Sequence, residues 1–96
     1  MPHFVYVLEN TIDESWYIGY TKDLKKRVVE HQNWYGSRTT SLKSGWKLIY
    51  FEGCLNIDDA KRREGYLKTT QGRRFLGLRL IEYIHQQRRL VGKLIY

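Results

Sequence analysis

The stretch Phe4–Tyr20 reads FVYVLENTIDESWYIGY and consists of two short apolar runs separated by a polar segment. The two runs, Phe4–Leu8 and Trp16–Tyr20, are rich in the β-branched and aromatic residues that favour strands. The polar segment between them, Glu9–Glu14, is typical of a loop. This stretch therefore predicts a β-hairpin.

A helix and a polar loop are predicted after the hairpin. Residues at helical spacing predict a helix over about 22–33, with Leu24 and Val28 facing the core. Thr21 is expected as its N-cap, because a hydroxyl accepts a hydrogen bond from the first turn. The glycines and serines over 33–45 indicate a loop before the next element.

One more strand and two more helices are predicted in the rest of the chain. The apolar run Trp46–Phe51 predicts a strand, and its near continuity indicates a central position in a sheet. The carboxylates of Asn56–Asp59 are favoured in the first turn of a second helix, which Thr69–Gly72 interrupts. A third, amphipathic helix is expected over about 75–87, and residues 90–96 are left unplaced. The predicted fold class is α+β, with the order β-β-α-β-α-α.

Length and composition predict one domain that spans residues 1–96. With 42% hydrophobic and 15% aromatic residues, the chain has enough apolar material for one core and no room for a second. No run approaches the about 20 apolar residues that a membrane span requires. The start, Met1–His3, lacks the charged leader and apolar core of a signal peptide. We therefore expect a cytoplasmic protein without a membrane partner.

The net charge of +7 is unevenly distributed along the chain. Residues 1–60 hold seven Lys or Arg and eight Asp or Glu, a net charge of −1. Residues 61–96 hold ten and two, a net charge of +8. This asymmetry indicates a polyanionic partner, nucleic acid or an anionic surface, while a basic solubilising face is the alternative.

The hairpin motifs resemble those of the GIY-YIG nuclease superfamily. The first signature appears as Val5-Tyr6-Val7, without the Gly-Ile of the family name, and the second, Tyr17-Ile18-Gly19, is intact. The resemblance covers about residues 4–85 and extends to small standalone proteins related to the nuclease domain of the bacterial excision-repair enzyme. It implies a small three-stranded antiparallel sheet with flanking helices. It also implies an endonuclease that depends on Mg²⁺ or Mn²⁺, acts on DNA rather than RNA, and takes part in DNA repair.

The resemblance assigns chemistry to two tyrosines on the hairpin. Tyr17 would be the general base or its relay toward the attacking water, and Tyr6 would align that water or complete the pocket. Antiparallel pairing is expected to bring both rings to one face of the sheet, although each ring alone also suits core packing. Gly19 would allow close approach of a phosphate, or would mark a bulge or a strand-end turn.

Three further residues complete the implied catalytic set. Arg27, ten residues after Tyr17, would clamp the phosphate, and His31, one helical turn later, would protonate the leaving group, hold a phosphate or make a structural hydrogen bond. Glu64 would bind the metal ion, and its alternative role is a surface salt bridge to Lys61 or Lys68.

Further residues are expected to bind nucleic acid without reading its sequence. The basic ones are Arg62, Arg63, Lys68, Arg73, Arg74, Arg79, Arg88 and Arg89. Trp34 and Tyr35 flank the polar loop and are expected to stack on unpaired bases, whereas Trp46 is expected in the core.

The sequence departs from the superfamily at one point. Many of its nucleases place an asparagine downstream of the glutamate, but residues 69–75 hold none, and Gln71 offers an amide in its place. One alternative function is therefore a non-catalytic nucleic-acid-binding module with the same fold. Another is an interaction protein whose basic helix recruits an acidic partner. For the nuclease, a protein partner that supplies specificity is also expected, because so small a domain has little surface for reading sequence.

Overall fold

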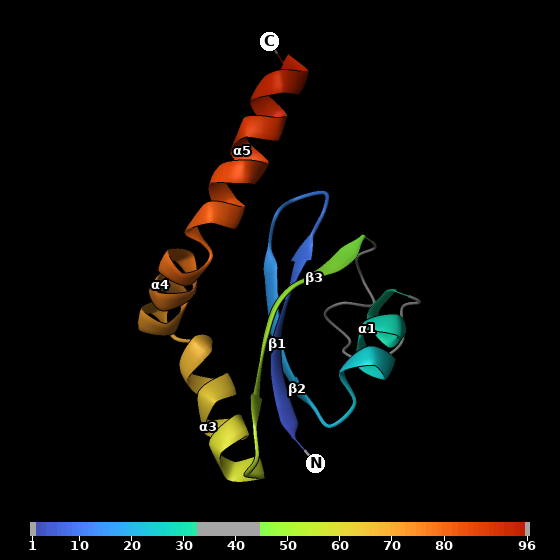
Figure 1. Cartoon of the computed structure of the whole chain (residues 1–96), viewed down its shortest axis with the longest axis vertical. Coiled ribbons are helices and arrows are strands. Elements are labelled where there is room, and N and C mark those ends of the chain that lie inside the picture. The colour runs from blue at the N-terminus through green and yellow to red at the C-terminus, as the bar shows by residue number, and fades with distance from the viewer. Residues whose placement is uncertain (1, 33–44, 96) are drawn as a thin grey trace. The chain divides into compact units, whose positions relative to one another are not determined.

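The computed structural model describes residues 2–32 and 45–95 and contains the hairpin that the sequence predicts (Figure 1). Strand β1 is His3–Asn10 and strand β2 is Trp16–Thr21, and the two pair antiparallel. In their register Tyr6 lies opposite Gly19, and Leu8 lies opposite Tyr17. Because side chains alternate between the two faces of a strand, both tyrosines lie on one face, as predicted.

The central strand of the sheet is β1, and the prediction that the third strand is central was wrong. Strand β3, Trp46–Cys54, pairs antiparallel with the other edge of β1, so the strand order is β2-β1-β3. In β1 every residue from Val5 to Asn10 is buried, whereas Phe51 on β3 is 52% exposed. Both strands have a continuous apolar run, and the run with the buried faces is the one in the middle.

Helix α1, Leu24–Gln32, begins one turn after β2. Its first turn is capped by Asp23, whose Oδ1 accepts the Lys26 N–H at 3.0 Å. The predicted cap, Thr21, lies in β2, and its hydroxyl instead accepts the Asp23 N–H at 3.1 Å. The carboxylate, two residues further along, is the group that reaches the free N–H of the first turn.

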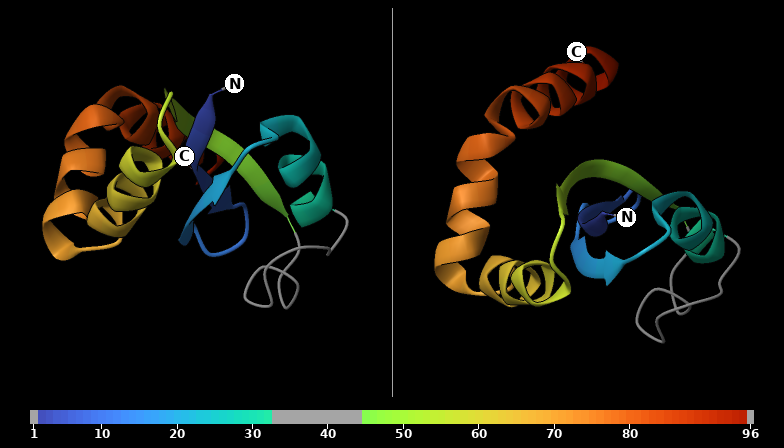
Figure 2. Two further views of the ribbon diagram at one scale, coloured as in Figure 1. Left: turned by 90° about the horizontal axis from the view of Figure 1, so that it is seen from below. Right: turned by 60° about the horizontal axis from the view of Figure 1, so that its bottom comes forward.

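The core of the first part of the chain lies between the sheet and α1. Buried Tyr6, Leu8 and Trp46 form one cluster, and Leu24 and Val28 of α1 pack against it, as predicted for all three elements. Figure 2 shows α1 on one side of the sheet and the start of helix α3 on the other.

Helix α3, Ile57–Leu67, begins after Asn56, whose Oδ1 accepts the N–H groups of Asp58 and Asp59 at 2.8 and 3.2 Å. The chain contacts divide into two compact units at this helix, residues 1–65 and residues 66–96. The single-domain prediction for 1–96 stays a prediction.

The second unit holds two helices where the sequence predicted one. Helix α4 is Thr70–Arg79 and helix α5 is Ile81–Ile95, with a break at Leu80. Thr69 caps α4 by accepting the Gly72 N–H at 3.0 Å. The order is therefore β-β-α-β-α-α-α, and all but the last of the unplaced residues 90–96 belong to α5. No helix in the described part of the chain is long and apolar enough to cross a membrane.

Candidate active site

Three aromatic rings from β1, β2 and α1 meet on the face of the sheet that α1 covers. Tyr6 is fully buried, and its hydroxyl lies 2.9 Å from Nε2 of His31. The ring of half-buried Tyr17 lies 6.3 Å from that of Tyr6 and 5.0 Å from that of His31. The structure thus brings together three of the five predicted catalytic side chains.

Gly19 makes room for the Tyr6 ring. A Cβ at position 19 would lie 2.5 Å from the Tyr6 hydroxyl oxygen and 2.6 Å from its Cζ. The close approach that a glycine permits is therefore used by the side chain opposite it in the sheet. The predicted contact of Gly19 with nucleic acid stays a prediction.

The pKa of the Tyr6 phenol lies well above its ordinary value. Burial is the largest cause, and the neighbouring Tyr17 phenol adds to it. The charge and hydrogen bond of Arg27 lower this pKa, and the charge of Glu64 raises it. Tyr6 is therefore protonated at neutral pH, and both charges act at its hydroxyl, which places Arg27 and Glu64 at the same site.

His31 is an uncharged part of this cluster. The side chain is 1% exposed, and burial, followed by the charge of Arg27, lowers the pKa of its imidazole, while Glu30 opposes the shift. The neutral ring shares one hydrogen bond with Tyr6. Of the three predicted roles, the structural hydrogen bond is the one that this geometry contains.

Arg27 is held from two sides. Its Nε lies 3.2 Å from Oε2 of Glu30, one turn further along α1, and its guanidinium also hydrogen-bonds the Tyr6 hydroxyl. Its side chain is 37% exposed, so a phosphate can reach it from solvent. A guanidinium that is fixed in this way suits a phosphate oxygen pair.

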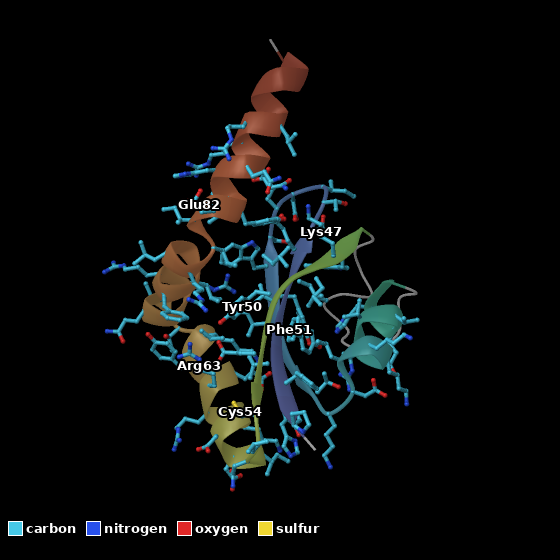
Figure 3. The ribbon with its side chains drawn as sticks, in the orientation of Figure 1. Lys47, Tyr50, Phe51, Cys54, Arg63 and Glu82 are labelled. Carbon is cyan, nitrogen blue, oxygen red and sulfur yellow. The ribbon has the colours of Figure 1, made fainter. Side chains whose placement is uncertain are left out.

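Glu64 is carried by a helix that a half-buried ion pair ties to the sheet. Arg63, the residue before it, donates from Nε to Oε1 of Glu52 at 2.7 Å and from a terminal nitrogen to Oε2 at 3.3 Å. The Tyr50 hydroxyl donates to the same carboxylate at 2.8 Å. Figure 3 shows Tyr50 of β3 and Arg63 of α3 on the side of the strand that faces α3.

Sequence reasoning missed Glu52 and Tyr50. Their spacing of two in a strand, which places both on one face, was the available signal. Arg63, predicted to bind phosphate, has its guanidinium engaged by Glu52, and its phosphate contact stays a prediction.

The residues present fit a magnesium-type ion that shares its ligands with a substrate. Among the described residues, no three His, Cys, Asp or Glu gather in a group that would hold an ion by themselves. Glu64 is a single, half-buried carboxylate whose charge reaches Tyr6. Mg²⁺ and Mn²⁺ accept such a site, because they keep several waters and take phosphate oxygens as ligands.

The other predicted contacts with nucleic acid are not gathered at this site. Arg62 is exposed and pairs with Asp59 at 2.7 Å. The remaining basic residues lie exposed in the second unit: Lys68, Arg73, Arg74, Arg79, Arg88 and Arg89. Trp34 and Tyr35 lie outside the described residues.

Comparison with known proteins gives one family and a set of relatives. A family model described as the GIY-YIG catalytic domain matches residues 2–76. UPF0213 protein CPE1444 of Clostridium perfringens is 41% identical over 66 residues, which cover 69% of this chain and 70% of that protein. UPF0213 protein OB0043 of Oceanobacillus iheyensis is 33% identical over 85 residues, which cover 88% and 95%. The solution structure of UPF0213 protein BH0048 from Bacillus halodurans is 31% identical and covers 79% of this chain and 82% of its own, with a TM-score of 0.49.

Proposed function

The chain belongs to the GIY-YIG family, and from this premise we propose that it is a metal-dependent endonuclease that hydrolyses phosphodiester bonds in DNA. The observation that carries the proposal is the convergence of Tyr17, Arg27 and Glu64 around buried Tyr6. This set supplies a phenol, a cation and a carboxylate, which are the groups that phosphodiester hydrolysis needs.

The two tyrosines divide the work between them. Tyr6 is fully buried, is hydrogen-bonded to His31 and has a raised pKa, so it is unsuited to take a proton from water. Its role is to position Arg27 and the ring of Tyr17. Tyr17 is the half-buried phenol of the pair and is the residue that receives the proton of the attacking water or relays it.

Arg27 binds the scissile phosphate. Glu30 and the Tyr6 hydroxyl fix the guanidinium before the substrate arrives, so little reorganisation is needed in the reaction. The guanidinium then offsets the negative charge that develops on the phosphate oxygens in the transition state.

Glu64 would hold the divalent ion. When bound, Mg²⁺ or Mn²⁺ supplies a positive charge for the phosphate and the leaving oxygen. The carboxylate orients that ion toward the substrate, and the ion pair between Arg63 and Glu52 fixes the helix that carries the carboxylate.

The size of the chain limits what it recognises. A domain of 96 residues offers little surface for base contacts, so cleavage is structure-selective or weakly sequence-selective. Any further specificity would come from a protein partner.

The second candidate function is a non-catalytic nucleic-acid-binding module. The observation that favours it is the lack of an asparagine in residues 69–75, where Gln71 is exposed in the first turn of α4. This module would keep the basic surface and bind phosphate without cutting it.

The experiment is cleavage of labelled linear, nicked, flap and branched DNA, and of matched RNA, with Mg²⁺ or Mn²⁺. We expect metal-dependent cutting of DNA by the wild type, with losses of about 10²-fold or more in Tyr17→Phe and Arg27→Ala. Arg62→Ala, an exposed arginine outside the site, is the control and keeps wild-type activity. Binding without cutting under every condition would instead support the non-catalytic module.

A further inference from the structure

A hollow of about 310 Å³ lies between the end of β2 and α1. It is lined by Tyr20–Asp23 and, from α1, by Lys26, Arg27 and Glu30. Arg27 belongs both to this lining and to the surroundings of the Tyr6 hydroxyl. The hollow therefore adjoins the place where the scissile phosphate is proposed to bind.

Positive charge remains uncompensated in this hollow. Both carboxylates of the lining are engaged, because Asp23 accepts the Lys26 backbone N–H at 3.0 Å and Glu30 lies 3.2 Å from Arg27 Nε. Lys22 and Lys26 are exposed, and within the described ranges 2–32 and 45–95 neither ammonium group makes an ion pair. Two lysine charges are thus available to an anion.

One wall of the hollow is a fixed aromatic ring. The Tyr20 hydroxyl lies 2.8 Å from Nδ1 of His3, and the two rings stack at 5.9 Å. Lys61 of α3 lies over the Tyr20 ring at 5.7 Å from its centre. The wall is therefore held by residues of β1 and α3 and needs no ordering when a ligand binds.

We propose that this hollow binds a backbone phosphodiester that flanks the scissile one, with Lys22 and Lys26 as its cationic contacts. The proposal rests on the nuclease function proposed above. The volume is at the lower end for ligand sites, which suits one phosphodiester with its sugar. Lysine contacts of this kind position a strand without reading its bases. The hollow lies in residues 1–60, whose net charge is −1, so composition directs attention to the other end of the chain.

The test is the salt dependence of binding to a labelled DNA duplex in EDTA, measured by fluorescence anisotropy. Each phosphate contact adds about 0.9 to the slope of log K against log salt concentration. We expect the Lys22→Gln/Lys26→Gln variant to lose about 1 to 2 from this slope. Lys25→Gln, an equally exposed lysine of α1 outside this lining, should keep the wild-type slope. Inorganic phosphate at constant ionic strength should not compete, because the ligand is a phosphodiester within a strand.

An unchanged slope in the double variant, an equal loss in Lys25→Gln, or competition by inorganic phosphate would overturn the proposal. Binding without metal separates it from the nuclease function. A wild type that cuts DNA, beside a double variant with an unchanged slope, leaves the nuclease standing and removes the hollow. A wild type that binds but never cuts removes the nuclease, and a lost slope then still supports the hollow. A wild type that binds no duplex at any salt concentration removes both.

Discussion

At Gly19 the lack of a side chain decides how the second motif works. The residue pairs with Tyr6 across the hairpin, and the Tyr6 ring occupies the space where a Cβ would stand. The third position of the motif is thereby tied to the tyrosine of the first motif, and only a glycine lets the Tyr6 hydroxyl reach His31.

Substituting Gly19→Ala is expected to lower the free energy of unfolding by about 1 to 3 kcal/mol, since a fully buried ring has to move. The control is Gly65→Ala on α3, where a Cβ meets nothing within 4 Å. That change should raise the free energy of unfolding by about 0.5 to 1 kcal/mol, because alanine is the better helix former. Urea denaturation measures both, and equal effects of the two substitutions would contradict this account of the motif.

His31 is expected to make stability depend on pH. Its pKa is lowered in the folded state by burial and by Arg27, so below the unfolded value of about 6.5 the unfolded chain binds a proton that the folded chain does not. The His31 contribution to stability is therefore complete above pH 6.5 and is lost as the pH falls toward the lowered folded pKa.

Unfolding curves between pH 7 and pH 5 measure this loss. The wild type should lose stability across the range, and His31→Gln should lose less. His85→Gln, an exposed histidine of α5, should lose as much as the wild type. A profile for His31→Gln that is parallel to that of the wild type would show that the imidazole is not the group involved.

At the scale of elements, the ion pair between Arg63 and Glu52 connects α3 to β3. Both side chains are partly buried, 30% and 22% exposed, and Tyr50 also binds the carboxylate. The neighbouring pair of Arg62 and Asp59 has the same chemistry but is 80% and 57% exposed. The two adjacent arginines thus form a matched pair for experiment.

We expect Arg63→Ala to lower the free energy of unfolding by about 1 to 2 kcal/mol, since it leaves a partly buried carboxylate without its charged partner. Arg62→Ala should cost about 0.5 kcal/mol or less, as solvent screens an exposed pair. Arg63→Ala should also raise the Mg²⁺ concentration needed for half-maximal cleavage, because Glu64 is no longer held in place. Equal stability losses and an unchanged metal requirement would contradict this role for the pair.

The elements that the sequence predicted well are those with a local signal. Alternation and turn composition were enough for the hairpin of β1 and β2, and helical spacing was enough for α1. The rank of β3 in the sheet was wrong because its apolar run looks like that of β1, and strand order depends on contacts distant in sequence. The break at Leu80 was missed because apolar spacing continues through it, while its backbone, at φ −106°, leaves the helix.

The same distinction between local and distant contacts applies to the candidate site. Tyr6 and Tyr17 on one hairpin, and Arg27 and His31 on one helix, could be grouped by spacing alone. Glu52 and Tyr50 could not be paired with Arg63 in this way, because they lie on a different element, and no pattern indicates which helix crosses a strand. The assignment of the two tyrosines likewise needed burial, which the structure supplies.

For the whole molecule, the central claim is that one carboxylate makes this small basic protein a metal-dependent nuclease. The most direct measurement is the single-turnover cleavage rate of a DNA substrate against Mg²⁺ concentration, beside binding in EDTA, for Glu64→Gln and Glu82→Gln. These two residues are the acids of the basic segment 61–96, and Glu82 lies exposed on α5. We predict that Glu64→Gln binds DNA as the wild type does but cuts it at least about 10²-fold more slowly, and that Glu82→Gln cuts normally. Normal cutting by Glu64→Gln, or equal losses in both variants, would contradict the claim.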